Sequence, residues 1–124
     1  MTKRLLILDD DKDILDVMKE IFIDEGYEVK TIENGDNILS DVISYRPDII
    51  LLDYILHGIN GGELCHQIKT NEATCTIPII IVTAYSKVIN SLGHYGCDSF
   101  VSKPFDITEL VQQVNELLNC PKIA

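Results

Sequence analysis

Positive charge is scarce in this sequence. Its 124 residues include 10 lysines and arginines against 20 aspartates and glutamates, which gives a formal net charge of -10. Such an acidic surface repels the phosphates of nucleic acid at long range, so the composition argues against direct nucleic-acid binding. A cation or a basic protein is the better-matched partner.

Paired cysteines and long hydrophobic runs are also missing. The four cysteines form no C-x-x-C pair and lie in or beside apolar segments, where we expect them to pack as small hydrophobic side chains: Cys65, Cys75, Cys97 and Cys120. Only four apolar residues separate the Met-Thr-Lys-Arg start from three aspartates, too few for a signal peptide or a membrane span. We therefore expect a soluble protein in a reducing, cytoplasmic setting.

Apolar runs of strand length alternate with segments of helical period, a pattern typical of a parallel sheet with crossover helices. The length and the 46% of hydrophobic residues fit a single domain over residues 1–124. The expected strands are residues 5–8, 28–32, 49–52, 79–82 and 99–101. Five helices are expected to connect and follow these strands, which makes the fold class α/β.

The helices are predicted from their apolar stripes and end signals. The first stripe, which one helical face would bury, consists of Ile14, Val17, Met18, Ile21 and Phe22. Asp11 is the expected cap of that helix, and Asp106 with Glu109 gives the last helix a capping-box-like start. The fourth helix, over residues 86–95, contains Asn90, Ser91 and Gly93, which are poor helix formers. Residues 58–62 are expected to form a glycine-bearing loop.

Reactive side chains follow three of the expected strands. Asp9, Asp10 and Asp11 come after the first strand, Asp53 ends the third, and Thr83 ends the fourth. In an open parallel sheet, ligands bind just outside the carboxyl ends of the strands. The sequence therefore predicts one site at this edge, although a single aspartate after a strand is more often a helix cap or turn residue.

Four motifs in this order resemble the receiver domain of two-component response regulators, and the resemblance covers the whole chain. They are the acidic residues after the first strand, the strand that carries Asp53, Val82-Thr83-Ala84, and Lys103-Pro104-Phe105. The resemblance implies a flavodoxin-like, doubly wound (βα)5 fold. Its five-stranded parallel sheet would have the order 2-1-3-4-5, which places the first and third strands side by side.

The resemblance also implies a metal site. Asp10 and Asp53 would ligate Mg²⁺ or Mn²⁺ directly, together with the backbone carbonyl of Ile55, and Asp9 would act through a water. The chemistry agrees, because carboxylates this close repel one another unless protons or a hard cation neutralise them. His57 stands where the family usually has proline, which gives the loop after Asp53 an extra backbone donor.

For the phosphoryl group, the resemblance implies that Asp53 is the acceptor and that the product is an acyl phosphate. Lys103, the Thr83 hydroxyl and the Ala84 backbone amide would hold the phosphoryl oxygens, because phosphoryl transfer mainly requires positioning and charge neutralisation. Thr83 and Phe100 would form the conformational switch. From the residues alone, Phe100 could equally be a half-buried aromatic on an edge strand.

The implied function is a phosphorylation switch rather than an enzyme with turnover, although the domain would promote its own phosphorylation and dephosphorylation. A histidine kinase, a phosphotransfer protein or a small phosphodonor would supply the phosphoryl group. A downstream protein or output domain would read the change, and a phosphorylation-dependent homodimer is compatible with this scheme.

Two alternatives stay open at this point. A receiver-like interaction module that does not use phosphate would keep the fold. A small haloacid dehalogenase-like phosphatase is suggested by Asp9-x-Asp11, but Asp13 stands where that pattern needs a small hydroxyl or apolar residue, and no cap domain fits.

Overall fold

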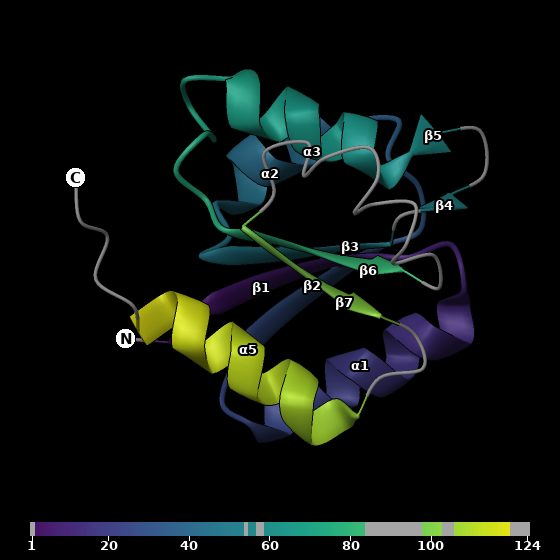
Figure 1. Ribbon diagram of the computed structural model, residues 1–124, viewed down its shortest axis with the longest axis vertical. Coiled ribbons are helices and arrows are strands. Elements are labelled where there is room, and N and C mark those ends of the chain that lie inside the picture. The colour runs from purple at the N-terminus through teal and green to yellow at the C-terminus, as the bar shows by residue number, and fades with distance from the viewer. Residues whose placement is uncertain (1, 54, 57–58, 84–97, 103–105, 120–124) are drawn as a thin grey trace.

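The computed structural model describes residues 2–53, 55–56, 59–83, 98–102 and 106–119 (Figure 1). Its centre is a five-stranded parallel sheet with the order β2-β1-β3-β6-β7. The strands are β1 (Arg4–Leu8), β2 (Glu28–Ile32), β3 (Ile49–Asp53), β6 (Ile79–Thr83) and β7 (Ser99–Ser102). Because β6 and β7 are the fourth and fifth strands of this sheet along the chain, the predicted order 2-1-3-4-5 is confirmed.

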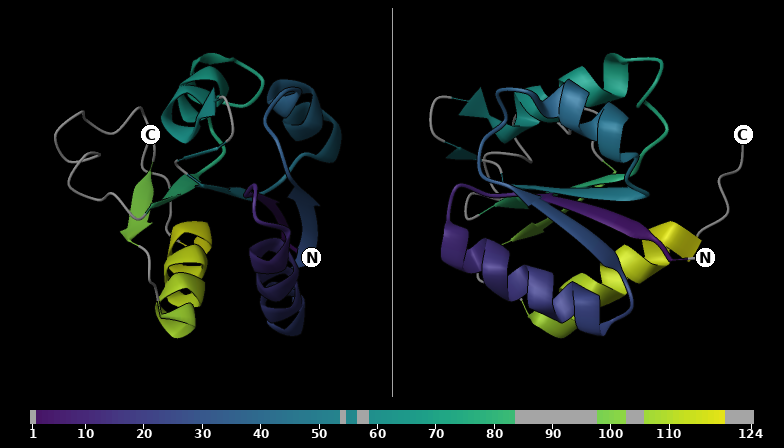
Figure 2. Two further views of the ribbon diagram at one scale, coloured as in Figure 1. Left: turned by 90° about the vertical axis from the view of Figure 1, so that its right-hand side faces the viewer. Right: turned by 180° about the vertical axis from the view of Figure 1, so that it is seen from behind.

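Helices cover both faces of the sheet (Figure 2). One face carries α2 (Ile38–Tyr45) and α3 (Gly61–Thr70), and the other carries α1 (Lys12–Asp24) and α5 (Ile107–Asn119). The helix predicted for residues 86–95 lies outside the described residues. Among the residues that are described, no helix is both long and apolar enough to cross a membrane.

The core consists of two hydrophobic layers, one on each face of the sheet. Leu6, Leu8 and Leu52 pack in the layer under α2 and α3, whereas Leu5 and Ile7 pack in the layer under α1 and α5. Successive residues of a strand point to opposite faces, so a strand covered on both faces is apolar at every position. This is why the central strands are recognisable in the sequence as unbroken apolar runs.

Polar side chains fix the helix starts. The Asp11 carboxylate accepts hydrogen bonds from the backbone N–H groups of Asp13 and Ile14, which confirms it as the cap of α1. The Asp106 carboxylate accepts from the N–H of Thr108 at 2.8 Å and so begins α5 as predicted. Each cap satisfies N–H groups that have no partner inside the helix.

Two predictions of burial are wrong. In α1, Met18 and Phe22 are buried and Ile14 packs against the core as predicted, but Val17 is 52% exposed and Leu15 is buried instead. Cys65 is buried, but Cys75 is exposed because it lies in the turn between α3 and β6. Cys97 and Cys120 lie outside the described residues.

The segment after β3 is more ordered than the predicted loop. β4 (Ile55–Leu56) and β5 (Ile59–Asn60) form a two-stranded antiparallel ribbon, and α3 begins at Gly61. Only two residues separate β4 from β5 in the sequence, a spacing typical of a tight hairpin. β5 leads directly into α3.

Candidate functional site

The carboxyl ends of the central strands bring the predicted residues to one edge of the sheet. Asp53 is the last residue of β3, and Asp9 and Asp10 follow β1, its hydrogen-bonded neighbour. On the other side of β3, Asp53 pairs with Val82 of β6, and Thr83 ends that strand. The sheet order alone therefore gathers residues that are far apart in the sequence.

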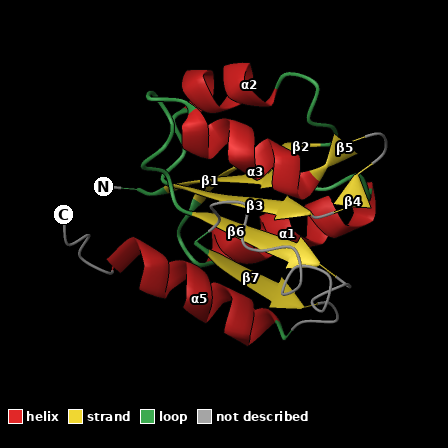
Figure 3. Ribbon diagram, turned by 45° about the horizontal axis from the view of Figure 1, so that its top comes forward, coloured by secondary structure: helices red, strands yellow, loops and turns green. Residues whose placement is uncertain are grey.

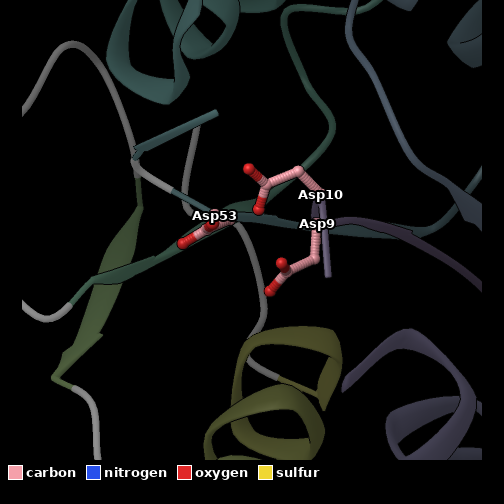
Figure 4. Close-up of side chains that lie close together, drawn as sticks. All are labelled: Asp9, Asp10 and Asp53. Carbon is pink, nitrogen blue, oxygen red and sulfur yellow. The ribbon is translucent and has the colours of Figure 1, made fainter. Parts of the chain in front are cut away.

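Three carboxylates form a cluster at this edge, which we call the acidic trio: Asp9, Asp10 and Asp53 (Figure 4). One oxygen from each side chain lies within 4.8 Å of one oxygen from each of the other two. Asp9 and Asp53 are only 4% and 8% exposed, and Asp10 is half-buried. The trio is thus enclosed on the protein side and reachable from solvent through Asp10.

Backbone hydrogen bonds fix the turn that carries two members of the trio. The Asp9 N–H donates to the carbonyl of Ile32 in β2 at 3.3 Å, and the Asp11 N–H donates to the Asp9 carboxylate at 2.9 Å. Asp11 itself caps α1. The backbone of Asp10 is therefore held between two anchored neighbours.

The trio suits a hard divalent cation. Carboxylate oxygens are the donors that Mg²⁺ and Mn²⁺ prefer, and three of them within this distance can share one ion. At close range and low exposure, three negative charges repel strongly, so a cation is stabilised here by relief of that repulsion. The residues present therefore fit the predicted metal.

Of the other predicted site residues, some lie in the described part of the chain and some do not. Thr83 is fully buried at the end of β6, and Phe100 lies half-buried in β7, packed against the core layer under α2 and α3. Ile55 opens β4, two residues after Asp53. Ala84 and Lys103 lie outside the described residues, so their roles stay predictions.

One residue at this edge was missed by the sequence analysis. Ser102 pairs with Thr83 at the end of β7, directly before Lys103 in the sequence. A serine at the end of an edge strand carries no distinctive signal, and only the strand register places it beside the site.

Comparison with known proteins decides the family. Residues 5–115 match the protein-family model of the response regulator receiver domain. The chain belongs to this family. The receiver domain is 34% identical over 117 residues to the response regulator ArlR of Staphylococcus aureus, a match that covers 93% of this chain and 52% of ArlR. The chain thus spans about half the length of the curated relatives that it matches.

Solved structures of receiver proteins agree with this assignment. The response regulator TrrA from Thermotoga maritima, in complex with Mg²⁺-BeF, is 35% identical with a TM-score of 0.85, over 94% of this chain and 99% of that one. A CheY-like receiver domain protein from Methanospirillum hungatei is 30% identical with a TM-score of 0.84, over 96% and 95% of the two chains. The receiver domain here therefore has the flavodoxin-like fold of the CheY-like proteins and belongs to two-component signalling.

Proposed function

We propose that this receiver domain accepts a phosphoryl group on Asp53 in a reaction that depends on Mg²⁺ or Mn²⁺. The acidic trio is the observation that carries the proposal, because it places one carboxylate at a strand end beside two others that suit a divalent cation. The solved complex of the similar protein TrrA with Mg²⁺-BeF supports Mg²⁺ as the metal. A bound cation would neutralise the carboxylates and part of the charge on the phosphoryl oxygens.

In this mechanism, a carboxylate oxygen of Asp53 attacks the phosphorus atom of the donor. The new O–P bond forms as the bond between phosphorus and the donor breaks, and the donor leaves with that electron pair. Asp10 and Asp53 would hold the cation directly, with the backbone carbonyl of Ile55 as a further ligand, and Asp9 would hold it through a water. The Thr83 hydroxyl, the Ala84 amide and the Lys103 ammonium bind the phosphoryl oxygens.

The acyl phosphate then changes what the domain binds. The added negative charge draws Thr83 and Lys103 toward Asp53, and Phe100 of β7 responds from its half-buried position. A histidine kinase or a phosphotransfer protein is the proposed donor, and a downstream protein or an output domain is the proposed receiver of the signal. The domain acts as a switch and does not turn over a substrate.

Intact mass spectrometry after incubation with acetyl phosphate and Mg²⁺ tests this function. Wild type should gain the mass of one phosphoryl group, and Asp53→Asn should gain none. Asp48→Asn is the matched control, because Asp48 lies at the opposite end of β3, where its carboxylate accepts from the N–H of Arg4 at 2.8 Å. This variant should be phosphorylated like wild type.

Three results would contradict the proposal. One is a wild type that gains no mass with either acetyl phosphate or phosphoramidate, as expected for an interaction module that does not use phosphate. Another is an Asp53→Asn variant that still gains the group. The third is steady turnover of phosphate esters, which would indicate a phosphatase.

A further inference from the structure

An ion pair between a mostly buried lysine and a partly exposed aspartate joins α3 to the start of β7, at the edge of the sheet opposite the acidic trio. The Lys69 Nζ lies 2.7 Å from the Asp98 Oδ2, and the two side chains are 14% and 34% exposed. Lys69 also donates to the carbonyl of Ile77 at 2.7 Å, and the same Asp98 oxygen accepts from the N–H of Ile79 at 2.8 Å. One carboxylate oxygen thus connects the end of α3, the start of β6 and the start of β7.

This connection acts on β7, whose Phe100 and Val101 also pack in the two core layers. β7 is the edge strand of the described sheet, and its neighbour there is β6 (Figure 3). On the opposite face, the Ser99 hydroxyl donates to Gln113 of α5 at 3.1 Å. Asp98 and Ser99 therefore fasten the amino end of β7 to a helix on each side of the sheet.

The other end of β7 lies at the proposed phosphorylation site. Thr83, which ends β6, pairs with Ser102, and Lys103 comes next in the sequence. An extended strand of four residues changes length very little, because its rise per residue is nearly fixed. Fixing the amino end against α3 therefore also sets how far the carboxyl end reaches toward Asp53.

We propose that Lys69 and Asp98 are positioning residues for phosphoryl capture. Their ion pair fixes the amino end of β7, and through this short strand it fixes the carboxyl end, where Ser102 pairs with Thr83 beside the acidic trio. This inference rests on the proposed function. It assigns a role in the reaction to two residues that touch neither the metal nor the phosphoryl group.

The variants must separate positioning from stability. Asp98→Asn leaves the Lys69 ammonium with little solvent and without its counter-charge, so a loss of stability is expected from this change alone. The double variant Lys69→Met/Asp98→Asn removes both charges together, so neither charge is left without its partner, and we expect its stability to be close to that of wild type. The double variant should recover the melting temperature that Asp98→Asn loses, while the Lys69–Asp98 ion pair stays absent.

Three measurements on the whole chain test the role: the rate of phosphorylation by acetyl phosphate, the Mg²⁺ affinity by calorimetry, and the melting temperature. The double variant should be phosphorylated about tenfold more slowly, since small misplacements of a catalytic group have effects of this size or larger. Its Mg²⁺ affinity should equal that of wild type, because the trio comes from β1 and β3. Glu28→Gln breaks the exposed Arg4–Glu28 pair at the same edge and should leave the rate unchanged.

Two outcomes would overturn the inference alone: a double variant that regains the wild-type rate together with its melting temperature, or one that loses Mg²⁺ affinity along with the rate. The first would show a purely structural pair, and the second a general disturbance of the site. A wild type that is not phosphorylated would overturn the proposed function, and with it this inference.

Discussion

Tyr45 illustrates how one residue can limit the pH range of the fold. Its ring lies near two cations, with the Arg4 Cζ at 5.6 Å and the Lys30 Nζ at 5.7 Å from the ring centroid. Its hydroxyl oxygen is buried and makes no hydrogen bond of normal geometry among the described residues, although the Glu28 carboxylate lies near it. Burial, with the carboxylate of Glu28 as a smaller cause, raises the pKa of Tyr45 from 10 to about 12.

This shift predicts a loss of stability at alkaline pH. Below pH 10 the phenol is protonated in the folded and unfolded chains, but between pH 10 and about 12 the unfolded chain loses the proton more readily, so the free energy of unfolding falls. Tyr45→Phe should remove this part of the fall. Urea unfolding of wild type and Tyr45→Phe at about pH 8 and about pH 11 measures this fall in the free energy of unfolding.

Measurement at the lower pH is the internal control. There Tyr45→Phe should be as stable as wild type or slightly more stable, because it removes a buried hydroxyl that makes no hydrogen bond of normal geometry among the described residues. An equal fall in wild type and variant between the two pH values would show that Tyr45 does not contribute.

Among the elements, α1 depends on its first turn. The Asp11 carboxylate accepts from Asp13 and Ile14 N–H groups at 3.0 and 3.4 Å. Asp11→Ala removes this cap and should lower the free energy of unfolding by about 1 kcal/mol in urea unfolding. Asp11→Asn retains an oxygen acceptor and should lose much less. Equal losses in the two variants would indicate that the charge, rather than the cap, stabilises the helix.

The same helix shows what periodicity can and cannot predict. Apolar residues occupy much of the circumference of α1, so periodicity alone favoured Val17, whereas packing against the sheet buries Leu15. The central strands were easier to predict than the helices. Both faces of the sheet are covered, so every strand position is apolar and no inward-facing set of residues has to be chosen. The β4–β5 ribbon was missed because two-residue strands are too short to show alternation.

The acidic trio was predictable and the Lys69–Asp98 pair was not, for a related reason. Each member of the trio follows an apolar run, and the order of a doubly wound sheet brings the ends of such runs together. Lys69 lies at the end of a helix and Asp98 at the start of a strand, positions where a charged residue is ordinary. Their meeting depends on how α3 packs, which the sequence pattern does not specify.

At the scale of the whole molecule, the two edges of the sheet differ in chemistry. The amino edge holds paired charges, including Lys69 with Asp98 and Arg4 with Glu28. The carboxyl edge gathers three carboxylates in a chain whose net charge is already -10. Repulsion is therefore concentrated where the proposed cation binds, so metal binding and folding should be coupled.

This coupling predicts that Mg²⁺ stabilises the entire domain. A ligand that binds only the folded state adds RT ln(1 + [L]/Kd), which is about 2.7 kcal/mol at a Mg²⁺ concentration of one hundred times Kd. Thermal melting of wild type should therefore shift upward with added MgCl₂ and return with EDTA. Asp10→Asn should lose the shift because it removes one carboxylate of the trio. Asp16→Asn, on the exposed side of α1, should retain it. Equal shifts in both variants would show that Mg²⁺ acts by general screening of the acidic surface instead of by binding at the trio.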